Sequence, residues 1–149
     1  MKRALVLIAA VTLGVVTLGV VTPAAAGDKI YRGGTMLTEG ISGRPYWVVQ
    51  AQCAGVYGAA SAYLADKGDA EGAEKAKAMG LAFFRDAVDR VMQDRGVPKP
   101  AAIEALSPTV VNGRTETLAA LRSEGDGPSS RWNYARSACL DVRDAYASN

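Results

Sequence analysis

The stretch Tyr46–Ala65, YWVVQAQCAGVYGAASAYLA, decides the fold of this 149-residue chain. It carries no formally charged side chain and contains Cys53, one of only two cysteines in the sequence. Placed on a helix, the stretch shows apolar or small side chains on every side, and such a helix has to be buried. Its glutamines and small residues make it a poor membrane span. We therefore predict a helix at the centre of a soluble core.

One side of this helix carries the small residues Ala51, Gly55 and Ala59, which are spaced by four positions. Residues at this spacing lie above one another on a helix and form a groove. Each glycine costs a helix roughly 1 kcal/mol relative to alanine, and close packing has to offset that cost. We expect the backbone of the second or third helix to enter this groove.

Helical patterns account for most of the remaining chain. Residues 66–69, DKGD, end the first helix and begin a second over about 70–95, which residues 96–100, GVPKP, bring to an end. On the second helix the spacing predicts a buried face that comprises Gly80, Leu81, Phe84, Ala87, Val88 and Val91. A final helix is predicted over about 130–147. The fold class is therefore all-α, a small four- to five-helix antiparallel bundle over residues 46–149.

The segment between the second and the last helix is less regular. Pro100 can open a short helix through about Leu106, and Ser107-Pro108 has the pattern of an N-cap and a first helical position. Asn112-Gly113 then interrupts the helical pattern. The pattern predicts one kinked helix or two short ones over residues 108–124.

The two cysteines are predicted to form a disulfide. Cys53 lies on the first helix, and Cys139 is at the centre of an apolar face on the last. Paired cysteines are typical of exported proteins, whereas two buried thiols are the alternative. A crosslink that closes a loop of roughly 85 residues contributes about 4–5 kcal/mol in the chain-entropy model. We therefore predict that the first and last helices are joined covalently.

Residues 1–26 have the order of a secretory signal peptide. Two basic residues precede a long apolar run, and Ala24-Ala25-Ala26 supplies small residues for a cleavage site. We predict cleavage after Ala26 and export to the periplasm or the extracellular space; an uncleaved anchor is the alternative. Residues 27–45 are rich in glycine and are predicted to form an irregular arm that lies over the bundle or is disordered.

The predicted mature chain carries no net charge. The sequence has 17 basic and 15 acidic side chains, and two of the basic ones, Lys2 and Arg3, lie in the predicted signal peptide. A neutral protein has no electrostatic attraction for nucleic acid or for an anionic membrane. We expect neither as a partner, and we expect no membrane span in the mature chain.

The sequence contains no histidine, which removes most common catalytic and metal sites. Nucleophilic triads with a histidine base and the usual zinc and copper sites depend on this residue. Two oxidised cysteines leave no thiol nucleophile, and no glycine-rich phosphate loop follows a strand. A pair of carboxylates is the remaining acid–base device, but the acidic residues mostly accompany Arg or Lys. We predict no catalytic residue, no metal site and no cofactor.

Two groups of residues are candidates for binding. Aromatic residues, among them Tyr57 and Trp132, concentrate on the first and last helices. Arg136 and Arg143 lie one above the other beside Trp132, and two guanidinium groups can hold a carboxylate or a phosphate. Core packing is the simpler interpretation of the aromatic residues, and charges that reach the solvent are the simpler interpretation of the two arginines.

From these features we predict an exported helical protein that binds another protein, as an accessory subunit, an inhibitor or an envelope factor. The alternative is a bundle that binds a small ligand through Tyr57, Trp132, Arg136 and Arg143.

Overall fold

The computed structural model describes residues 27–148, so the predicted signal peptide lies outside the described part of the chain. A short 3-10 helix, Glu39–Ile41, precedes four α-helices. The α-helices are α1 (Tyr46–Asp66), α2 (Ala70–Arg95), α3 (Lys99–Glu124) and α4 (Arg131–Ala147). Residues 27–148 contain no strand beyond a single isolated bridge, and the predicted all-α class is confirmed. None of the described helices is both long and apolar enough to cross a bilayer.

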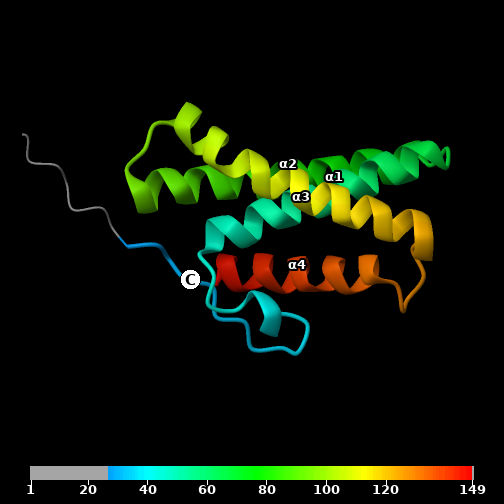
Figure 1. The fold of residues 1–149 in the computed structure, drawn as a ribbon, viewed down its shortest axis with the longest axis horizontal. Coiled ribbons are helices and arrows are strands. Elements are labelled where there is room, and N and C mark those ends of the chain that lie inside the picture. The colour runs from blue at the N-terminus through cyan, green and yellow to red at the C-terminus, as the bar shows by residue number, and fades with distance from the viewer. Residues whose placement is uncertain (1–26, 149) are drawn as a thin grey trace, which may run out of the picture.

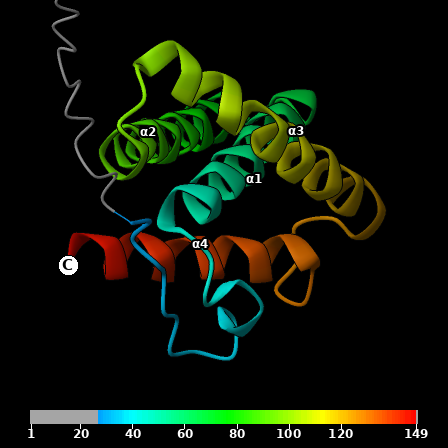
Figure 2. The ribbon, with the colours of Figure 1, turned by 60° about the vertical axis from the view of Figure 1, so that its left-hand side comes forward.

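The central helix is α1, as its uniformly apolar sequence predicts. Helices α2 and α3 pack along it on two sides, and α4 crosses it obliquely on a third (Figures 1 and 2). Buried side chains therefore occur all round α1 rather than on one stripe. Two hydrophobic clusters share this helix. One joins it to the arm, to α4 and to Ala76 and Phe83 of α2, and the other joins it to α2 and α3.

The groove predicted on α1 receives α3. Ala51 and Ala59 are completely buried, and Gly55 between them faces the α3 backbone. The approach is close from both helices, because a Cβ built on Gly113 of α3 would lie only 2.8 Å from the carbonyl oxygen of Gln52. Small residues on α1 and α3 therefore allow these two helices to touch through their backbones.

The predicted break at Ser107-Pro108 is wrong, because residues 99–124 form one helix, and of the two alternatives for residues 108–124 a single helix is found. Ser107 does not cap a new helix; its hydroxyl donates to the carbonyl of Ile103, 2.8 Å away, within α3. Pro108 lies exposed in the helix interior, where its missing N–H and its ring cost the helix about 3 kcal/mol. Gly113 marks the close contact with α1 rather than a turn. Packing on α1 thus overrides local helix-breaking signals.

The buried face of α2 differs in part from the predicted one. Leu81 is 52% exposed, whereas Phe83, which the spacing did not select, is 2% exposed. The reason lies in the contact at Gly80, where a Cβ would stand 3.2 Å from the Ala54 carbonyl oxygen of α1. This close approach leaves Phe83 over α1, where its ring stacks on that of Tyr57 with centroids 5.6 Å apart.

The disulfide between Cys53 and Cys139 joins the middle of α1 to the middle of α4, as predicted. Cys139 and Val142 are the only buried residues of α4. The covalent bond therefore lies at the one place where α4 enters the core.

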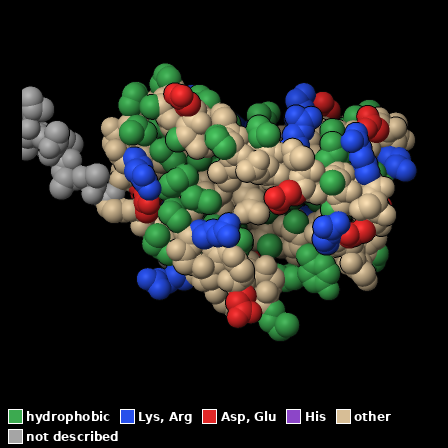
Figure 3. All heavy atoms as spheres, viewed as in Figure 1, with side chains coloured by type: hydrophobic (Ala, Val, Ile, Leu, Met, Phe, Trp, Pro, Cys, Tyr) green, Lys and Arg blue, Asp and Glu red, His purple; other side chains and the backbone are tan. Residues whose placement is uncertain are grey.

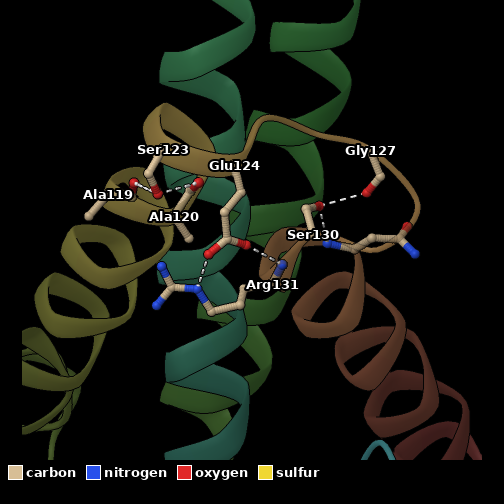
Figure 4. A network of polar contacts seen from close by, with 8 residues as sticks. Ala119, Ala120, Ser123, Glu124, Gly127, Ser130 and Arg131 are labelled. Atoms are coloured by element: carbon tan, nitrogen blue, oxygen red, sulfur yellow. Dashed lines mark hydrogen bonds and ion pairs between the residues drawn. The ribbon is translucent and has the colours of Figure 1, made fainter.

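The turn between α3 and α4 is fixed by polar contacts (Figure 4). The Glu124 carboxylate accepts hydrogen bonds from the backbone N–H and the guanidinium of Arg131. The backbone bond and then the side-chain bond from Arg131 hold the pKa of Glu124 below its ordinary value. Ser130 caps α4, because its hydroxyl accepts from the N–H of Asn133 and donates to the carbonyl of Gly127.

The arm, residues 27–45, lies over the bundle, which was the first of the two predicted alternatives. Tyr31 is 1% exposed and packs edge-to-face against Tyr46 at the start of α1. The hydroxyl of Thr35 donates to the carboxylate of Asp141 on α4, 2.9 Å away. The first and last segments of the described chain are therefore neighbours.

The beginning of the arm is tied to α1 and α2 by Asp28. Arg95, in the last turn of α2, donates two hydrogen bonds to the Asp28 carboxylate at 2.8 and 2.7 Å. The indole N–H of Trp47 donates to the same carboxylate, and the next backbone N–H, of Lys29, donates to the buried carboxylate of Asp94. The hydrogen bond from Arg95 is the main reason that the pKa of Asp28 is lowered.

Candidate functional site

An apolar groove lies between the arm, α1 and α4, and we call it the arm groove. It has a volume of about 410 Å³. The disulfide forms part of its wall, and no charged side chain lines it. Its lining residues are Met36, Leu37, Gly40, Ile41, Val49, Gln52, Cys53, Val56, Tyr134, Ala135, Ala138 and Cys139.

Exposed hydrophobic side chains gather around this groove. Met36 is 92% exposed, Tyr134 is 58% exposed and Leu37 is 41% exposed. Single exposed hydrophobic residues are common on proteins, but a group of them around one concave surface is a feature of binding sites. The arm groove is therefore the strongest candidate for a binding surface among the described residues.

The turn that carries Met36 and Leu37 is held in place by the buried side chain of Thr38. Thr38 is completely buried, and its hydroxyl is 3.0 Å from that of Thr35 and 3.1 Å from the Thr35 carbonyl. A Cβ on Gly33 would lie 2.3 Å from the Thr38 hydroxyl, so only glycine fits beside it. The two exposed side chains thus stand on an ordered turn, which lowers the entropy lost when a partner binds.

Of the residues predicted to bind a ligand, Tyr57 lies in the core. It is 6% exposed, it stacks on Phe83, and its ring meets that of Trp132 edge-to-face at 5.9 Å. Burial raises the pKa of Tyr57, and the charges of Arg136 and Arg143 act in the opposite direction. Tyr57 therefore supports the site as a packing residue and does not reach the surface.

Trp132 is half-buried and lines a small cavity between α1, α3 and α4. This cavity has a volume of about 190 Å³, and its charged lining residues are Glu116 and Arg131. Arg136 is exposed, and Arg143 donates two hydrogen bonds to its neighbour Asp144. Neither of these two arginines lines the cavity, so the structure brings Tyr57 and Trp132 together but places both arginines outside.

Carboxylates do not converge in the cavities described for residues 27–148. The arm groove contains none, and the cavity beside Trp132 contains only Glu116. No group of three or more His, Cys, Asp or Glu side chains in the described residues is placed to hold a metal ion. Basic and acidic side chains alternate over the face in Figure 3, with no large area of one sign.

The sequence predictions missed the arm groove. Its exposed residues come from two segments far apart in the chain, the glycine-rich arm and α4. One local signal exists, because Met36-Leu37 is an apolar pair among glycines and polar residues. That signal does not reveal that Tyr134 of α4 lies opposite, since this depends on the disulfide and on the path of the arm.

Comparisons with protein-family models, with curated proteins and with solved structures find no match to this chain. The function is therefore argued from the geometry of the chain itself.

Proposed function

We propose that this chain is an exported helical protein that acts by binding another protein through the arm groove. The observation that carries the proposal is the group of exposed side chains, Met36, Leu37 and Tyr134, around a concave surface without charge. Export rests on the predicted signal peptide, and a disulfide that joins two helices fits an oxidising compartment.

The lining of the groove defines the partner's chemistry. A surface without charged residues penalises a charged occupant, which would lose its hydration without gaining a counter-charge. Methionine adapts its shape to different apolar side chains, and Tyr134 offers a large ring with a hydroxyl that can remain in water. We therefore expect the groove to hold an uncharged apolar segment of the partner protein.

Site-directed photo-crosslinking in the native host tests the proposal. A photoreactive residue replaces Tyr134 in the full chain, and the matched control carries it at Val111 of α3, which is 59% exposed and outside the groove. We expect one specific protein adduct from position 134 and none from position 111. No adduct at 134, or the same adducts at both positions, would contradict the proposal.

Substitutions provide a second readout of the same site. Tyr134→Asp introduces a charge at the edge of the groove, and Val111→Asp introduces it at a position of equal exposure. Pull-down of the crosslinked partner should be lost with the first variant and retained with the second. Both variants should unfold at the same denaturant concentration, because neither position is buried.

A second candidate function is the binding of a small ligand, which the cavity beside Trp132 favours. The charged residues of its lining are Glu116 and Arg131, and an anionic ligand would compete with Glu124 for the Arg131 guanidinium. Titration of a Trp47→Phe variant with small carboxylic acids, followed by the fluorescence of Trp132, tests this function. A concentration-dependent change that Arg131→Ala abolishes would support it, and no change would exclude these ligands.

A further inference from the structure

A second apolar groove lies on the side of α1 that faces away from α4, between α2 and α3, and we call it the three-helix groove. Its volume is about 470 Å³. It is lined by Ala54, Gly58, Ser61, Ala62, Ala65, Lys77, Gly80, Leu81, Phe84, Val110 and Arg114. It shares no lining residue with the arm groove.

The three-helix groove leaves part of α1 uncovered. Among the α1 residues that line it, Ala54 is buried, Gly58, Ser61 and Ala62 are only half-buried, and Ala65 is exposed. On the α2 wall Leu81 is 52% exposed and Phe84 is half-buried. A helix without a polar face thus has a gap in its cover, and the gap continues onto exposed apolar side chains of α2.

The dimensions of the groove suit a helical occupant. Its floor runs along α1 from Ala54 to Ala65, which corresponds to about 16 Å or three helical turns. Small side chains on the floor let another backbone approach closely. Leu81 and Phe84 on one wall and Val110 on the other provide apolar contacts for a helix that lies between them.

Both walls carry a positive charge, and the lining contains no carboxylate. Lys77 lies on α2 and Arg114 lies on α3. Lys77 has one ion pair, with the exposed Glu74 outside the lining, and such surface pairs are weak. Arg114 forms no ion pair among the described residues, and its side chain runs along the groove past Gly58.

We infer that the three-helix groove binds a helical segment of a partner protein whose apolar stripe is flanked by Asp or Glu on both sides. The stripe has apolar residues at the i, i+3, i+4 and i+7 spacing and covers the half-exposed side of α1. The flanking carboxylates pair with Lys77 on one wall and with Arg114 on the other. This surface is separate from the arm groove and recognises acidic rather than uncharged segments, so the inference goes beyond the proposed function.

A designed peptide tests the inference on the full chain after export. The peptide is an acetylated and amidated helix of about 18 residues, with leucine at the i, i+3, i+4 and i+7 positions and glutamate on both flanks. There are two control peptides. In the first, lysine replaces every glutamate; the second has the same composition, but its leucines are placed without the helical spacing. We expect the acidic peptide to bind with a Kd in the micromolar range and both controls to bind at least about fivefold more weakly.

Protein variants locate the binding. The double variant Lys77→Glu/Arg114→Glu should bind the acidic peptide about fivefold to thirtyfold more weakly than the wild type and bind the basic peptide more tightly. The matched control is Lys75→Glu, an exposed residue of α2 outside the groove whose carboxylate partner is Glu71. Chemical shifts in labelled protein should change at Gly58, Ala62 and Leu81.

Several outcomes would overturn the inference. Equal binding of the acidic and basic peptides, or no effect of the double charge reversal, would remove the role of Lys77 and Arg114. Shift changes confined to the arm groove would place the peptide elsewhere. Binding of a fluorescent fatty acid in the three-helix groove without binding of the acidic peptide would assign the groove to a lipid ligand instead.

Discussion

Gly55 of α1 lies against the backbone of Val110 of α3, and a Cβ at position 55 would stand 2.3 Å from the Val110 carbonyl oxygen. The backbone nitrogen of Arg114 would be only 2.7 Å away. Backbone atoms inside a helix cannot shift as a flexible side chain can. The distance between α1 and α3 therefore depends on the absence of a side chain at this position.

Gly55→Ala is expected to destabilise the protein. The added methyl group forces α3 away from α1, and overpacking of this kind costs about 1–3 kcal/mol. Gly58→Ala is the matched control one turn later, where the nearest atom to a Cβ is the side-chain Cδ of Arg114 at 4.0 Å. That variant should gain about 0.5–1 kcal/mol from helix propensity. Urea unfolding followed by circular dichroism measures both, and equal free energies of unfolding would contradict the prediction.

Removal of the disulfide should loosen α4 more than the rest of the bundle. The double variant Cys53→Ala/Cys139→Ala is expected to lower the free energy of unfolding by about 4–5 kcal/mol. The decrease is smaller if the unfolded chain retains structure. Cys139 and Val142 are the only buried residues of α4, whereas the hydrophobic cluster that joins α1 to both α2 and α3 contains neither cysteine. Hydrogen exchange should therefore show early loss of protection in α4 while α2 keeps its protection. Uniform loss across all four helices would show that α4 is not separately dependent on the bond.

The attachment of the arm is expected to weaken in acid. Arg95 lowers the pKa of Asp28 below its ordinary value of 3.8 in the folded protein, so the carboxylate contributes stability above pH 3.8. That contribution is lost as the pH falls through the lower folded pKa. Wild-type protein should therefore lose its stability advantage over Asp28→Asn as the pH falls below 3.8.

Urea unfolding of both proteins at pH 7, 4 and 2.5 measures this difference. Asp126→Asn, at an exposed position of the turn between α3 and α4, is the control for the loss of one carboxylate. Fluorescence of Trp47 reports on the site directly, because its indole donates to Asp28. A difference between wild type and Asp28→Asn that is the same at every pH would contradict the prediction.

Much of the architecture could be predicted from the sequence, because it follows from local chemistry. A segment without charge or polar face had to be the central helix, and Gly68 and Gly96, which have positive φ, mark the ends of α1 and α2. The pairing of Cys53 with Cys139 was predicted from the export signal and from the positions of both residues on apolar helix faces.

The errors arose where tertiary contacts override local signals. Gly113 and Pro108 suggest a break, but the contact of Gly113 with α1 favours a continuous helix. The choice of Leu81 over Phe83 for the core could not be corrected from periodicity, since the rotation of α2 depends on Gly80 touching α1. The two grooves also escaped prediction, because each is formed by three separate segments whose packing the local sequence does not reveal.

The disulfide joins residues that are 86 positions apart, and Cys139 belongs to the last helix. Synthesis proceeds at roughly 5–20 residues per second, so Cys53 emerges about 4 to 17 s before its partner. During that interval the rest of α1 and the whole of α2 and α3 are synthesised, and the thiol of Cys53 lies on the side of α1 that α4 will cover. A chain that stops before α4 therefore keeps Cys53 without its disulfide partner, and in an oxidising compartment its free thiol can enter mixed disulfides.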